Sequence, residues 1–100
     1  MKIGISTASL FGRFFTEDAL KFLSDNRVET CEVFLESFCE YNKGFGELLN
    51  TLKGTTEVHS IHTLTTQFEP QLYSVNVRAQ KDSFVLLDQT MQCAECFGAK

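Results

Sequence analysis

The sequence has no concentration of basic residues, because its nine Lys and Arg residues are scattered and the net charge is −4. Nucleic acid is therefore not an expected partner, since binding to phosphates needs clustered positive charge. Apolar runs extend over a few residues, far short of the roughly 20 that cross a bilayer, so no membrane span is expected. The N-terminal residues lack the apolar region of a signal peptide, and we expect a cytoplasmic protein.

Two glycine-rich nucleotide motifs are also missing. Neither Gly-x-Gly-x-x-Gly nor Gly-x-x-x-x-Gly-Lys-Ser/Thr follows any strand-like stretch. These motifs hold phosphates on backbone N–H groups at the start of a helix. Their absence removes the commonest classes of nucleotide-binding protein.

Cysteine is present at four positions, but its pattern does not predict a disulfide framework or a metal knuckle. Without a secretory signal, disulfides are disfavoured. Cys93 and Cys96 have the spacing of redox and zinc motifs. They fall in the last turns of a predicted helix, however, whereas a redox pair opens one. We interpret these two, with Cys31 and Cys39, as ordinary buried thiols.

What the sequence does contain is enough apolar material for one folded domain over residues 1–100. Its hydrophobic content is 43%, and ten of the residues are Phe. Strand-like stretches at 2–7, 30–36 and from 57 alternate with helix-like stretches at 16–26, 45–52 and 77–97. Thr16 is expected to cap the first helix, with acidic residues in the following turn. This order predicts an α/β fold with a parallel βαβαβα arrangement.

The strand-to-strand spacing of about 30 residues fits a doubly wound sheet or a (β/α)8 barrel. Three parallel strands alone leave two open edges and half-covered faces, and a barrel needs about 250 residues. We therefore interpret the chain as the first three units of a TIM barrel that continues beyond residue 100. The alternative is a fragment that must associate to be stable, for example as a homo-oligomer.

The end of the third strand and the loop after it carry most of the candidate site residues. His62 lies near the strand end, and Thr65, Gln67 and Glu69 follow in the loop. Imidazole, hydroxyl, amide and carboxylate groups at the C-terminal end of a parallel strand suit a small polar ligand. The alternatives are a structural imidazole and a plain connecting loop. His59 is expected on the opposite face from His62, by period-2 alternation, in a structural role.

Two glutamates accompany the second strand. Glu32 lies inside it, where a buried carboxylate is costly unless paired. It either faces a partner or substrate, or it is solvated on the helix side of the sheet. Glu36 lies at the strand exit and could reach substrate hydroxyl groups.

Four segments resemble the sugar phosphate isomerase/epimerase family, the xylose-isomerase-like TIM barrels. They are Met-Lys-Ile-Gly-Ile-Ser-Thr-Ala-Ser-Leu at 1–10, Cys-Glu-Val-Phe-Leu-Glu at 31–36, Val-His-Ser-Ile-His at 58–62 and Phe-Gly-Ala-Lys at 97–100. The run at 66–74 resembles a loop of one bacterial branch. Each segment is a weak motif, but their order and spacing are fairly specific and together cover nearly all of the chain.

The resemblance implies a metal-dependent isomerase or epimerase that moves a proton next to a carbonyl through an enediolate. A divalent ion (Mn²⁺, Mg²⁺, Co²⁺ or Zn²⁺) is expected for the full-length protein, with its carboxylate and histidine ligands and the catalytic residues beyond residue 100. A strand-two glutamate like Glu32 faces the interior in this family. Together with His62, Glu36, Thr65, Gln67 and Glu69, it would bind a sugar or sugar phosphate.

Two other functions remain open from the sequence. The related endonuclease IV branch places a zinc-binding histidine near the end of its third strand, and His62 is the position here that could correspond. A zinc phosphodiesterase is thus one alternative, although the net negative charge of the chain disfavours binding to DNA. A non-catalytic sugar-binding module is the other.

Overall fold

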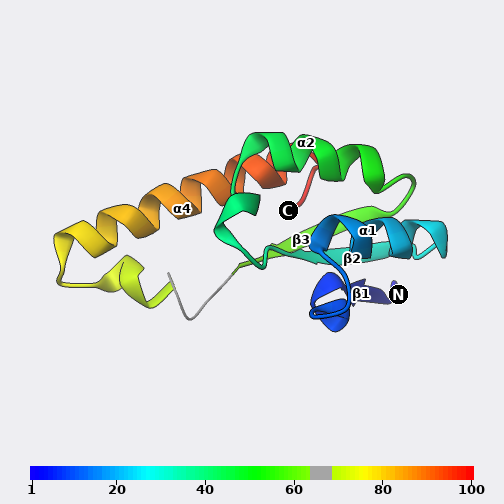
Figure 1. Ribbon diagram of the computed structural model, residues 1–100, viewed down its shortest axis with the longest axis horizontal. Helices are drawn as coiled ribbons and strands as arrows, with labels where there is room; N and C mark the ends of the chain where they lie inside the picture. The colour runs from blue at the N-terminus through cyan, green and yellow to red at the C-terminus, as the bar shows by residue number, and fades with distance from the viewer. Residues whose placement is uncertain (64–68) are drawn as a thin grey trace.

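A computed structural model describes residues 1–63 and 69–100 of the chain (Figure 1). Strands and helices alternate, as the sequence predicts, and short 3-10 helices lie in three of the connections. The elements are β1 (Gly4–Ser6), η1 (Thr7–Leu10), α1 (Thr16–Asp25), β2 (Thr30–Phe34), η2 (Phe38–Glu40), α2 (Lys43–Leu52), β3 (Glu57–His62), η3 (Glu69–Tyr73) and α4 (Val77–Glu95). The protein is therefore an α/β protein with a βαβαβα order.

The three strands form one parallel sheet in the order β1-β2-β3. Ser6 pairs with Glu32 across the first two strands. Between the second and third, Cys31 pairs with Val58 but Glu32 pairs with Ser60, so the register shifts by one residue. The carboxyl ends of the strands lie at one edge of the sheet, as parallel pairing requires.

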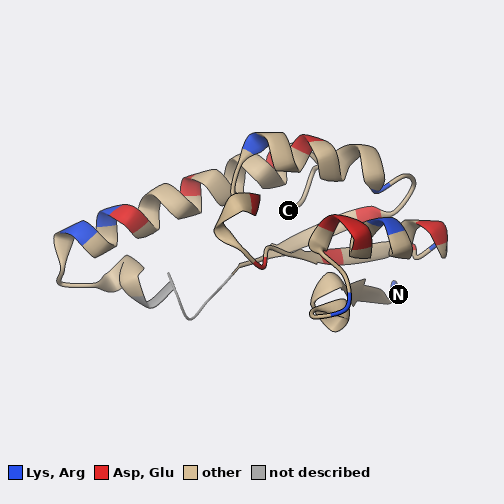
Figure 2. Ribbon diagram, viewed as in Figure 1, with Lys and Arg blue, Asp and Glu red and all other residues tan. Residues whose placement is uncertain are grey.

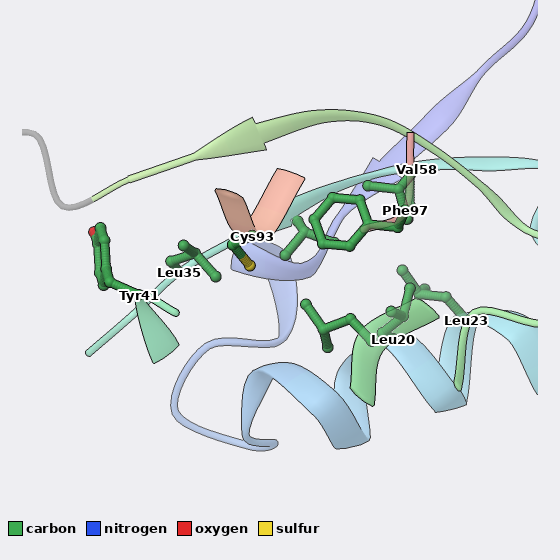
Figure 3. Close-up of a cluster of buried hydrophobic side chains, with 10 residues drawn as sticks. Leu20, Leu23, Leu35, Tyr41, Val58, Cys93 and Phe97 are labelled. Carbon is green, nitrogen blue, oxygen red and sulfur yellow. The ribbon is translucent and has the colours of Figure 1, made fainter. Parts of the chain in front are cut away.

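One face of the sheet and the helices α1, α2 and α4 supply a single buried apolar cluster (Figure 3). Alternate residues of β2 point into it, because side chains alternate along a strand. The cluster comprises Leu20, Leu23, Cys31, Val33, Leu35, Tyr41, Leu49, Val58, Cys93 and Phe97. The opposite face of the sheet carries the residues that alternate with these along β2, among them Glu32 and Phe34. The candidate functional site lies on this face.

Helices α2 and α4 approach each other closely at Gly46. A Cβ atom on this residue would lie 2.5 Å from the carbonyl oxygen of Cys93 and 2.9 Å from its Cα. Those atoms belong to the backbone of α4, so they cannot move aside without moving the helix. The absence of a side chain at this buried position allows the two helices to pack in contact.

The start of the first helix differs from the prediction. Thr16 is the first residue of α1, and Phe15 occupies the N-cap position without a side-chain hydrogen bond. The Thr16 hydroxyl lies within hydrogen-bond distance of the carbonyl oxygen of Phe34 (3.0 Å) and of Glu40 Oε1 (3.2 Å). Because the hydroxyl has a single hydrogen, it donates to one of these two oxygens at a time, and it links α1 to β2 or to η2 instead of capping its own helix.

The four cysteines are free thiols, but only two fit the predicted burial. Burial raises the pKa of Cys31 to about 11 and that of Cys93 to about 12. Cys96 is half-buried and Cys39 is exposed, so the prediction of buried thiols is wrong for Cys39. Cys39 lies in the short 3-10 turn of η2, which leaves its side chain at the surface.

Within residues 1–63 and 69–100, no helix combines the length and apolar character needed to cross a bilayer.

Candidate functional site

Glu32 is the centre of a polar cluster on the sheet face that is turned away from the helices. The Ser6 hydroxyl donates to Glu32 Oε1 at 3.2 Å, and the Ser60 hydroxyl donates to Oε2 at 3.1 Å. The three residues stand side by side in the register of the sheet. Each strand thus contributes one polar side chain, and the carboxylate is paired, as its position in a strand demands.

His62 lies at the end of β3 beside this carboxylate. Its Nδ1 atom is 3.8 Å from Glu32 Oε1, and the two side chains are 43% and 40% exposed. The distance is too long for a hydrogen bond, but a protonated imidazole would form an ion pair there. The sequence analysis predicted both residues as candidates, and the structure brings them together.

Aromatic rings extend the site from His62 toward the loop after β1. The ring centroids of Phe34 and His62 are 4.9 Å apart. Phe11 then meets Phe34 edge to face, with centroids 5.9 Å apart. The series of three rings was not predicted, although period-2 alternation places Phe34 on the same face as Glu32 and could have indicated it.

Glu36 lies in a neighbouring cavity and not in the Glu32 cluster. This cavity holds about 460 Å³ and is lined by Phe11, Gly12, Arg13, Phe14, Phe15, Asp18 and Glu36. Desolvation raises the pKa of the Glu36 carboxyl, and the nearby Glu17 carboxylate raises it further. Because Phe11 lines the cavity and also contacts Phe34, the cavity adjoins the Glu32 cluster.

A buried carboxylate at Glu40 was missed by the sequence analysis. It is only 4% exposed and accepts hydrogen bonds from the backbone N–H groups of Glu36 (2.7 Å) and Ser37 (3.4 Å) and from the hydroxyl of Thr16. Desolvation is the main cause that raises its pKa. The Ser37-Phe-Cys-Glu40 spacing, typical of a capping box, was the available signal. Its contacts are internal to the fold and indicate a structural role.

The predicted residues of the loop after β3 are only partly described. Thr65 and Gln67 lie outside the described residues. Glu69 begins η3, and only its backbone is described. The prediction that these three residues join the site therefore stays a prediction.

The expected placement of His59 is wrong, because the register shift interrupts the alternation of β3. His59 is the additional residue between Val58 and Ser60. It lines a cavity of about 430 Å³ together with Ser60, Glu32 and other residues of the open sheet face. It therefore lies on the same side as Glu32 instead of across the sheet.

The residues present do not form a complete site for the divalent metal that the family resemblance implies. Among residues 1–63 and 69–100, no group of three or more His, Cys, Asp or Glu side chains is arranged to hold an ion. Glu32 and His62 offer two donors, and both oxygens of Glu32 already accept serine hydroxyls. A metal ion at this position would need further ligands.

No family profile, curated protein or solved structure matches the chain.

Proposed function

We propose that the chain is the N-terminal part of a xylose-isomerase-like (β/α)8 barrel that isomerises or epimerises a sugar or sugar phosphate. The observation that carries the proposal is the Glu32 cluster: a carboxylate held by Ser6 and Ser60 beside the imidazole of His62. It lies on the free face of a parallel sheet. In a closed barrel this face becomes the interior, and the strand ends form the mouth where substrates bind.

The arrangement of the elements supports the barrel. Consecutive parallel strands with all helices on one face curve in one direction, as barrel units do. After α4 the chain returns to the sheet, where the N–H group of Lys100 donates to the carbonyl oxygen of His59 at 3.0 Å. Ile3 and Ile5 are 79% and 41% exposed at β1, where further units would cover them.

The chemistry of the cluster suits a polyol. A carboxylate accepts hydrogen bonds from sugar hydroxyls, and an imidazole can donate or accept one. Glu32 and His62 are each more than one-third exposed, so a ligand can reach both. In this proposal they position the substrate, together with Glu36, while proton transfer next to the carbonyl is carried out by residues outside the described segments.

The test uses the whole gene product. We expect aldoses or ketoses to raise the melting temperature, and we expect isomers or epimers to form when Mn²⁺, Mg²⁺, Co²⁺ or Zn²⁺ is added. Glu32→Gln should weaken sugar binding about tenfold or more, since a hydrogen bond to a charged group contributes about 1.5–3 kcal/mol. Glu29→Gln, at an exposed carboxylate beside Lys2, is the matched control. A protein that neither binds nor converts any sugar would contradict the proposal.

The charge distribution disfavours one alternative function, and the same experiment separates the other. Figure 2 shows Lys and Arg spread over the helices with acidic residues among them, so no basic surface favours a zinc phosphodiesterase. Binding without conversion, with every metal tested, would indicate a non-catalytic sugar-binding module.

A further inference from the structure

The cavity beside Phe11 differs in chemistry from the Glu32 cluster. Three of its lining residues are phenylalanines of the loop after β1, and two others are the carboxylates Asp18 and Glu36. Phe11 and Phe15 are 61% and 68% exposed. Ligand sites are concave and lined mainly by apolar and aromatic side chains, and exposed apolar patches mark interaction sites.

The cavity adjoins the site already described through a line of contacting rings, and the backbone of Phe34 is held by two hydrogen bonds. Phe11 contacts Phe34, and Phe34 contacts His62. The N–H group of Phe34 donates to Thr7 Oγ1 at 2.8 Å, and its carbonyl oxygen accepts from the Thr16 hydroxyl at 3.0 Å. A ligand at Glu32 that extends along this line of rings reaches the cavity beside Phe11.

The charges of the cavity disfavour a phosphate group. Among the described residues that line it, Arg13 is the one cation, against the two carboxylates. Desolvation raises the pKa of Glu36, and the nearby Glu17 carboxylate raises it further. The first turn of α1 already holds Glu17 and Asp18. These acidic side chains occupy the positive end of the helix dipole, which would otherwise attract an anion.

We propose that the cavity beside Phe11 binds the uncharged end of a sugar, and that the substrate is therefore an unphosphorylated sugar. This inference rests on the proposed function for the sugar itself. The Phe11 ring packs against the C–H groups of the carbon chain, and Glu36 accepts a hydrogen bond from a terminal hydroxyl. A phosphate at that end would meet the carboxylates and be repelled.

The experiment is calorimetric titration of the whole gene product with matched ligand pairs. The probes are D-fructose, D-glucose, D-ribulose and D-xylose, each as the free sugar and as its terminal phosphate ester. We expect the best free sugar to bind at least tenfold more tightly than its phosphate ester, by analogy with the cost of placing like charges together. Phe11→Ala should weaken that binding about three- to tenfold, the effect of losing one aromatic contact.

Phe38→Ala is the matched control, because Phe38 is similarly exposed (56%) and also lies beside an aromatic ring, that of Tyr41. If Phe11→Ala does not fold, Phe11→Leu replaces it and should still weaken binding measurably. Phosphate esters that bind as tightly as free sugars, or equal effects of the Phe11 and Phe38 variants, would overturn this inference and leave the proposed function standing. Failure of every free sugar and every ester to bind would overturn both.

Discussion

At the scale of single residues, Glu40 makes the stability of the protein depend on pH. Its pKa is raised above the ordinary 4.5, mainly by desolvation. The folded protein therefore holds this proton to a higher pH than the unfolded chain does. The stabilisation is fully present below pH 4.5 and is lost as the pH rises through the folded-state pKa.

Glu40→Gln should remove this dependence, since an amide of similar size keeps an acceptor oxygen but never ionises. We expect the variant to gain stability relative to the natural protein as the pH rises from acidic to neutral values. Urea unfolding at a series of pH values measures the difference. Because the Glu36 carboxylate also raises the pKa of Glu40, the measured difference includes the interaction between these two groups. A constant difference across the series would contradict the prediction.

Individual site residues were predicted from the sequence where local rules suffice. The proximity of Glu32 and His62 could be expected, because a carboxylate within a strand needs a partner and because strand ends gather at one edge. Glu40 was missed, since its burial depends on α1 and on the loop before η2, which lie far apart in sequence. His59 was misplaced because a register shift cannot be read from the pattern of one strand.

At the scale of helices, the contact between α2 and α4 is sensitive to a single methyl group. Gly46→Ala would place a Cβ atom 2.5 Å from the carbonyl oxygen of Cys93. The helices must separate, and we expect the free energy of unfolding to fall by about 1–3 kcal/mol, the usual cost of overpacking. Chemical denaturation of the two proteins measures the loss.

Gly44→Ala provides the control in the same helix. Gly44 is exposed, and its Cβ would meet only the side chain of Asn42, at 3.2 Å. Helix propensity alone favours alanine by up to about 1 kcal/mol. Equal effects of the two substitutions would show that helix packing at Gly46 does not matter.

The existence and order of the helices and strands were predictable, but their ends were less so. Amphipathic spacing indicated α1, α2 and α4, but only part of each apolar stripe is buried. Leu20, Leu49 and Cys93 join the core, whereas Phe84 and Met91 of α4 are exposed. The predicted strands were longer than the observed β1 and β2. Strand ends depend on which neighbours remain within hydrogen-bonding reach, and that is a property of the sheet and not of the segment.

At the scale of the whole molecule, too much apolar surface remains uncovered for the 100 residues to behave as an isolated monomer. Ile3 and Ile5 are exposed at β1, and Val77, Phe84 and Met91 are exposed along α4. Figure 1 shows the N-terminal half of α4 and η3 projecting beyond the sheet. Open strand edges add unpaired backbone groups.

We therefore expect residues 1–100, expressed alone, to associate with increasing concentration. Sedimentation velocity across a concentration series measures this. Replacement of Ile3 and Ile5 together by Thr should reduce association, while replacement of the exposed Glu29 by Gln should leave it unchanged. A monodisperse monomer that melts cooperatively would refute the expectation.

The additional residue in β3 makes the length of this strand adjustable at one position. Deletion of His59 would leave Val58 facing the core and Ser60 and His62 facing Glu32 and Phe34, now with regular alternation. Deletion of Ile61 would turn His62 toward the core instead. We expect the first shortened chain to fold and the second to lose stability, as circular dichroism melting would reveal. Within β3, we thus expect the strand to tolerate loss of a residue only at the register shift, where His59 has no partner in β2.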